Sequence, residues 1–232
     1  MKFEMKGEIK VLLLDMNDTF MFGGDRFGPE EDYSVHFRSL GGKLDANLVN
    51  ELINSVYDDL LEKYPDPEYR ESFPSLEYAF EELSGNTSLE LKEMEHLVNT
   101  FAHHELGKVP QEYSETIRLL SEQYYIGLVA DIWSPKNLWI DEFERAGILD
   151  CFDILLFSSD SGIVKPSRKL FMNALEQLGV EPEDVLVVGD SPRRDLGGAL
   201  AAGLECVLVG GKTHPDAHGT ASDFLEFSNS IL

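Results

Sequence analysis

Three stretches of the chain carry side chains that could bind a metal ion and act on a phosphate group. The apolar run VLLLD ends on Asp15, and Asn17 follows two residues later. The run VVGD ends on Asp190, with Asp195 five residues further on, and Lys165 stands directly before a proline in GIVKP. One or two carboxylates suffice to hold Mg²⁺, which keeps part of its water shell. The ion and a lysine could together neutralise a phosphoryl group while a carboxylate attacks the phosphorus atom.

These residues follow apolar runs that predict buried strands. The runs show no alternation of apolar and polar residues, which indicates strands covered by helices on both faces. Amphipathic stretches separate the runs, and this order of strand and helix indicates βαβ units. The expected strands are 10–15, 124–130, 153–158, 184–190 and 205–210, and the expected helices are 110–123, 135–147, 167–179 and 193–203. The sequence therefore predicts an α/β fold with a Rossmann-like parallel sheet as its core.

The ends of the predicted strands are where a ligand should bind, because parallel α/β sheets bind ligands outside the carboxyl ends of their strands. Asp15 and Asp190 end predicted strands, Asp131 follows one, and Lys165 lies in the loop after another. A single acid in a loop is equally well explained as the cap of the next helix. Because acids recur at several strand ends, we favour one common site at this rim of the sheet.

A long segment near the N-terminus contains little that resembles a strand. Its apolar residues recur at helical spacing, as in the run from Leu48 to Leu60, and prolines in YPDPEY and FPS separate the helices. The sequence predicts a small all-helical cap over residues 21–108, inserted into a core formed by residues 1–20 and 109–232.

The composition excludes some classes of partner. The net charge is −24, from 43 acidic and 19 basic residues, which argues against binding nucleic acid through its phosphates. No apolar run reaches the length of a membrane span, and the N-terminus shows no signal-peptide pattern. We expect a cytoplasmic protein that binds neither nucleic acid nor membrane. The charge fits an ordinary solvated acidic surface or adaptation to high salt, and no pattern indicates an oligomeric state.

The chain resembles the haloacid dehalogenase superfamily, in the subclass with a helical cap after the first motif. The resemblance rests on Asp15 with Thr19, on the Lys165-Pro166 pair, and on VVGDSPRRDLGGALAAG at 187–203. It implies a Mg²⁺-dependent hydrolase that acts on a small phosphorylated metabolite through an aspartyl-phosphate at the first aspartate.

The resemblance also implies a role for each matching residue. Asp15 corresponds to the nucleophile. The backbone carbonyl of Asn17 would join Asp15 and Asp190 around Mg²⁺, and Asp195 would support the metal through water. Lys165 would bind the phosphate group and offset the charge of the aspartates.

Two positions depart from the family pattern. Phosphatases of the family generally have aspartate where this chain has Asn17, and that aspartate transfers a proton to and from the reacting oxygens. General acid–base catalysis typically contributes about 10²–10⁴-fold, and an amide does not supply it. The family usually has Ser or Thr where this chain has Ala130, and the carboxylate of Asp131 next to it would repel a phosphate. Ser134 is an alternative source of a hydroxyl.

Two functions therefore stay open. The first is a slow phosphatase, and the second is a regulatory protein that binds a phosphorylated ligand without efficient turnover. Arg26, in the aromatic stretch FMFGGDRF, is predicted to contact the substrate. Several basic residues follow the strand ends and predict a region that attracts an anion; they are Lys136, Lys165, Arg168, Lys169, Arg193 and Arg194.

Overall fold

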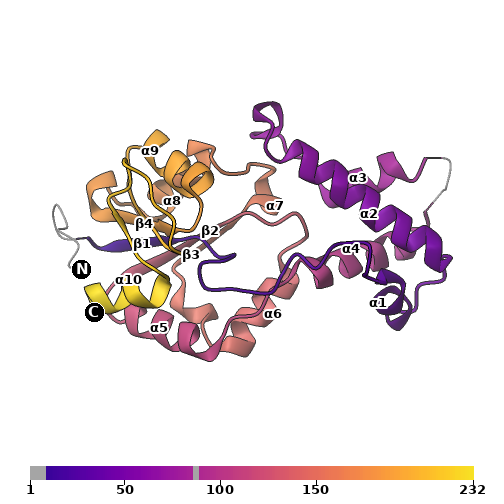
Figure 1. Ribbon diagram of the computed structural model, residues 1–232, viewed down its shortest axis with the longest axis horizontal. Helices are drawn as coiled ribbons and strands as arrows, with labels where there is room; N and C mark the ends of the chain where they lie inside the picture. The colour runs from indigo at the N-terminus through magenta and orange to yellow at the C-terminus, as the bar shows by residue number, and fades with distance from the viewer. Residues whose placement is uncertain (1–8, 86–88) are drawn as a thin grey trace.

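The computed structural model describes residues 9–85 and 89–232. The first eight residues of the predicted core, and residues 86–88 of the predicted cap, lie outside the described residues. Figure 1 shows the chain as a sheet with its covering helices on the left and a group of helices on the right.

The described residues form a parallel six-stranded sheet in the order β3-β2-β1-β4-β5-β6. The strands are β1 (Val11–Leu14), β2 (Tyr125–Ala130), β3 (Ile154–Phe157), β4 (Val185–Gly189), β5 (Glu205–Leu208) and β6 (Gly219–Thr220). The predicted Rossmann-like core is confirmed. The sequence did not predict β6, because its two residues, Gly and Thr, form no apolar run.

Both faces of the sheet are buried by helices, which explains why its strands are apolar throughout. In β1, Leu12 and Leu14 face one apolar cluster, and Val11 and Leu13 face the other. Figure 1 shows helices both below the sheet and above it. Those below are α5 (Gln111–Ser121), α6 (Asn137–Ala146) and α10 (Phe224–Ile231), and those above are α8 (Arg168–Leu178) and α9 (Gly197–Ala201).

The region after β4 differs from the single helix that the sequence predicted over 193–203. A π-helical turn, Pro192–Leu196, comes first, and α9 follows it. The wider turn arises because the carbonyl of Ser191 accepts the N–H of Leu196 at 3.2 Å as well as that of Asp195 at 3.0 Å. Shorter helical turns elsewhere are Leu149–Cys151, α7 (Ser158–Ser161) and Pro182–Asp184.

The helices on the right of Figure 1 form the small helical cap. They are α1 (Tyr33–Ser39), α2 (Ala46–Lys63), the 3₁₀ turn Pro67–Tyr69, α3 (Leu76–Leu83) and α4 (Leu91–Glu105). They bury a second apolar cluster, which includes Phe37, Ile53, Phe80 and Phe101 of the cap and also Val164 of the core. The exact boundaries at 20/21 and 108/109 stay a prediction. No helix within the described parts of the chain has the length and apolar character needed to cross a membrane.

The cap is joined to the core by two chain segments that run side by side. Phe22 and Lys108 exchange backbone hydrogen bonds of 2.9 and 2.8 Å. A Cβ atom at Gly24 would lie 2.4 Å from the carbonyl oxygen of Glu105, so only glycine fits there. The guanidinium group of Arg26 donates to the carbonyls of Gly23 and Leu106 at 2.7 Å, and also to that of His103. These contacts fix the direction in which the cap leaves the sheet.

We expect Phe143→Ala to lower the free energy of unfolding by about 3–5 kcal/mol, because it deletes a large buried side chain and leaves a cavity. Phe143 is fully buried, with ring centroids 5.3 Å from Phe152 and 6.1 Å from Phe20. Urea unfolding followed by circular dichroism measures the change. Leu119→Ala, at a half-exposed position, is the matched control and should stay within about 0.5 kcal/mol. Equal losses in the two variants would contradict this packing.

Candidate active site

Three carboxylates converge at the carboxyl ends of β1 and β4. Asp15 follows β1, Asp190 follows β4, and Asp195 lies in the π-helical turn. One oxygen from each lies within 4.8 Å of the others, a spacing that suits joint coordination of one hard divalent cation. Burial and the charge of Asp15 raise the pKa of Asp190, which is the response expected of acids placed close together. The residues present therefore fit a Mg²⁺ ion.

Lys165 is held between two of these carboxylates. Its ammonium nitrogen lies 2.5 Å from Oδ1 of Asp15 and 2.7 Å from Oδ1 of Asp195, and the side chain is almost fully buried. Burial acts to lower the pKa of Lys165, but the charges of Asp15, Asp195 and Asp131 raise it above its ordinary value. The lysine therefore stays protonated and neutralises part of the carboxylate charge.

Asp195 is oriented by its surroundings. Its Oδ2 accepts the N–H of Ser191 at 2.9 Å while Oδ1 faces Lys165. Burial and the charge of Asp15 raise the pKa of Asp195. A Cβ atom at Gly189 would lie 2.4 Å from the carboxyl carbon of Asp195, so the strand end requires glycine for this close approach.

The loop after Asp15 is a compact turn. The carbonyl of Met16 accepts the N–H groups of Thr19, Phe20 and Met21 at 3.0–3.2 Å. The hydroxyl of Thr19 donates to Oδ2 of Asp15 at 2.9 Å, which fixes the orientation of that carboxylate. Asn17 lies in this turn and lines the same cavity as Asp15.

Ala130 and Asp131 have different surroundings, although they are neighbours in sequence. Ala130 ends β2 and is buried in the apolar core. The Asp131 carboxylate lines the cavity and accepts the hydroxyl of Tyr64 at 2.5 Å and the N–H of Lys165 at 3.2 Å. Burial raises the pKa of Asp131, and the charge of Lys165 and the Tyr64 bond oppose this. Ser134 is buried and lies outside the cavity lining, and its hydroxyl has no hydrogen-bond partner among the described residues.

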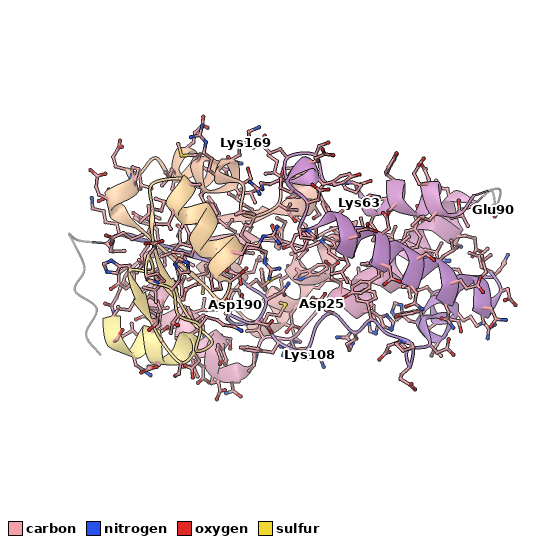
Figure 2. All side chains as sticks on the ribbon, turned by 45° about the horizontal axis from the view of Figure 1, so that its top comes forward. Asp25, Lys63, Glu90, Lys108, Lys169 and Asp190 are labelled. Carbon is pink, nitrogen blue, oxygen red and sulfur yellow. The ribbon has the colours of Figure 1, made fainter. Side chains whose placement is uncertain are left out.

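The cavity has a volume of about 170 Å³ and lies between the core and the cap. The core contributes Asp15, Asn17, Asp131 and Lys165, and the cap contributes the aromatic rings of Tyr57 and Tyr64. Figure 2 shows Asp190 on the core and Asp25 between it and the cap helices. A larger cavity of about 260 Å³, lined by Trp133 and residues near Phe73 and Ser158, contains none of the predicted site residues.

Some residues of the cavity had no individual role in the site predicted from the sequence. They are Asp18, Asp25, Tyr57, Leu61, Tyr64, Glu105, Trp133 and Arg194. Tyr64 lies in YPDPEY, where the prolines indicated only a break between helices. Arg194 was counted among the basic residues near the strand ends without a role of its own. Arg26, predicted to contact the substrate, instead donates to backbone carbonyls and lies outside the cavity lining.

Comparison with known proteins gives the family. A family model described as haloacid dehalogenase-like hydrolase matches residues 44–209, which is most of the chain. The chain belongs to this family. This confirms the predicted family and hydrolase class, whereas the subclass with the cap after the first motif stays a prediction.

Two relatives of this haloacid dehalogenase-like hydrolase are named as phosphatases. The chain is 27% identical over 212 residues to the glyceraldehyde 3-phosphate phosphatase of Pyrococcus furiosus. This match covers 86% of this chain and 80% of that protein. It is 41% identical over 106 residues to the phosphoserine phosphatase of Thermus thermophilus, and the match covers 45% of this chain and 43% of that protein. This second match spans less than half of either protein.

A solved structure shows the same fold. The 2-haloacid dehalogenase of Pseudomonas syringae pv. Tomato DC3000 superposes with a TM-score of 0.64. The two chains are 20% identical, and the match covers 96% of this chain and 98% of that one. At this level of identity the likeness concerns the fold alone.

Glu105 should make the stability of the protein depend on pH. Its carboxylate accepts the N–H groups of Trp133 and Ser134 at 2.6 and 3.0 Å, and burial raises its pKa from 4.5 to about 7. Between these values the folded state binds more protons than the unfolded state, so the free energy of unfolding falls as pH rises. We expect Glu105→Gln to lessen the fall from pH 5 to 8 by about 2–3 kcal/mol.

Urea unfolding without divalent cations, at several pH values, measures this difference. The loss of one hydrogen-bond acceptor in Glu105→Gln lowers the free energy of unfolding by the same amount at every pH, so it does not contribute to the difference in slope. Glu62→Gln, on the exposed face of α2, is the control and should run parallel to the wild type. A Glu105→Gln curve that also runs parallel to the wild type would show that the carboxyl group titrates normally.

Proposed function

We propose that the protein is a Mg²⁺-dependent phosphatase that hydrolyses a small phosphorylated metabolite through Asp15. The observation that carries this proposal is the ammonium group of Lys165 held between Asp15 and Asp195, with Asp190 close by, at the wall of a cavity. The residues proposed as nucleophile, cation and metal ligands thus lie together. The phosphatase names of the relatives support the same reaction class.

In the proposed reaction, an oxygen of Asp15 attacks phosphorus and the bond from phosphorus to the leaving alcohol oxygen breaks. Thr19 orients the attacking carboxylate, and Lys165 offsets the negative charge that gathers around it. Asp15, the backbone carbonyl of Asn17 and Asp190 would hold Mg²⁺, with Asp195 in support. The bound ion would neutralise phosphoryl oxygens.

Asn17 determines how fast this reaction runs. Its amide can orient a leaving oxygen or a water molecule, but it does not transfer a proton. The leaving alcohol must then take its proton from water, and hydrolysis of the aspartyl-phosphate lacks a general base. We therefore expect slow turnover and a preference for leaving groups that depart without protonation.

A second candidate function is ligand binding without efficient turnover. Asn17 and the buried methyl group of Ala130 favour it, because one removes proton transfer and the other removes a hydroxyl from the phosphate site. In either case the ligand is a small phosphorylated molecule, and the cavity of about 170 Å³ fits that size class. The cytoplasmic location stays part of this proposal.

The two functions differ in what p-nitrophenyl phosphate hydrolysis with Mg²⁺ should show. We expect slow hydrolysis by the wild type, none above background by Asp15→Asn, and a gain of roughly 10²-fold in Asn17→Asp, because the restored acid can transfer a proton. Asp216→Asn, an exposed acid, is the control. Activity that survives Asp15→Asn would overturn the mechanism. An inactive wild type with an active Asn17→Asp would favour the binding function.

Mg²⁺ binding should depend on Asp190. We expect Asp190→Asn to raise the dissociation constant for Mg²⁺, measured by calorimetry, by roughly tenfold or more, because it replaces a charged ligand with a neutral one. Asp216→Asn again serves as the control and should bind like the wild type. A wild-type affinity in Asp190→Asn would remove this residue from the metal site, whatever the activity assays show.

A further inference from the structure

Arg194 lies in the wall of the cavity and has no role in the mechanism above. It is in the π-helical turn, between Asp190 and Asp195, and its backbone N–H donates to the hydroxyl of Ser191 at 3.2 Å. Its side chain lines the cavity together with Asp15 and Lys165. The turn thus places a guanidinium group in the wall of the same cavity as the proposed nucleophile.

The donors of this guanidinium group are not used by the protein. An arginine has five N–H donors, yet no hydrogen bond or ion pair joins those of Arg194 to any residue in 9–85 or 89–232. Its carbon Cζ lies 5.3 Å above the ring centre of Tyr64, a cation–π contact that leaves the edge of the group free. The neighbouring Arg193 is different, because it is exposed and donates to the carbonyl of Pro65.

The charges of the cavity require a second cation for a phosphate ligand. Lys165 and Arg194 are the two cations in the described lining. Lys165 is already shared between Asp15 and Asp195. Asp131 adds a further negative charge beside Ala130, where the usual hydroxyl is absent. Burial acts to lower the pKa of Arg194, but Tyr64 and the carboxylates around it raise that pKa, so the group stays charged.

We propose that Arg194 binds the phosphoryl group of the ligand and takes the place of the hydroxyl that Ala130 lacks. The planar guanidinium group presents paired donors that match two phosphate oxygens, and it also offsets the charge of Asp131. This inference rests on the proposed function only in that the ligand carries a phosphate group. It holds for both a slow phosphatase and a protein that binds without turnover.

The test is the binding of inorganic phosphate, measured by calorimetry with Mg²⁺ present. We expect Arg194→Ala to raise the dissociation constant by roughly tenfold to a hundredfold, because charge-assisted hydrogen bonds are lost. The dissociation constant of Arg194→Lys should lie between those of Arg194→Ala and the wild type, because lysine keeps the charge but lacks the paired donors. Arg168→Ala, which removes an exposed arginine from the start of α8, should stay within about twofold of the wild type.

A second variant tests whether Arg194 binds phosphate or only stabilises the structure through its contact with Tyr64. Ala130→Ser restores the hydroxyl of the family pattern. In the Arg194→Ala background we expect it to recover part of the phosphate affinity, and the double-mutant cycle should be non-additive. If Arg194 only held the cap through Tyr64, a hydroxyl at position 130 would give no such rescue.

The outcomes distinguish this inference from the proposed function. Wild-type phosphate affinity in Arg194→Ala, or no phosphate binding by the wild type at millimolar concentration, would overturn the inference even if p-nitrophenyl phosphate is hydrolysed. Phosphate binding that depends on Arg194 in a protein without turnover would sustain the inference and reject the phosphatase. Circular dichroism confirms that each variant is folded before its affinity is compared.

Discussion

The ion pairs of Lys165 with Asp15 and Asp195 are the interaction on which the site depends. All three groups are buried, and a buried charge that loses its partner typically destabilises a protein by about 3–5 kcal/mol. They come from three separate segments of the chain. Their meeting requires β1 and β4 to be neighbours in the sheet, and it requires Gly189 to admit the carboxyl group of Asp195. The parallel sheet is therefore a precondition for the chemistry as well as for stability.

The cap encloses a cavity whose described lining is negatively charged, and it adds the carboxylates of Asp25 and Glu105 but no cation. The described lining holds five carboxylates and two cations, so an anionic ligand is repelled unless the cations and a metal ion are placed close to it. Tyr64 is central to that placement, because its hydroxyl binds Asp131 and its ring faces the guanidinium group of Arg194. The cap thus influences the phosphate site directly, in addition to enclosing it.

The parts of the site that could be predicted from sequence are those fixed by strand ends. Each of three acids, Asp15, Asp131 and Asp190, follows a run that is apolar throughout. In a parallel sheet the carboxyl ends of such strands lie at one rim, where ligands bind. Residues contributed by the cap, such as Tyr64 and Glu105, follow no such rule. Their positions depend on how the cap docks, which is set by close contacts such as that of Gly24 with the Glu105 carbonyl. Arg26 illustrates the difficulty, since its donors serve that junction instead of the cavity.

The departures from the family pattern differ in how well the surrounding structure accommodates them. A carboxylate placed by chance beside a phosphate site would be buried without partners, at a considerable cost in stability. Asp131 instead accepts two hydrogen bonds, one from the cap at Tyr64 and one from the backbone of Lys165. Arg194 lies close enough to balance its charge. In a site that had lost its function, nothing would maintain these partners of Asp131, which come from three segments of the chain. The arrangement therefore favours a site that still binds its ligand, with residues that differ from the family pattern. Under the proposed function, Asn17 then limits proton transfer in a site where Lys165 and Arg194 bind the phosphate group.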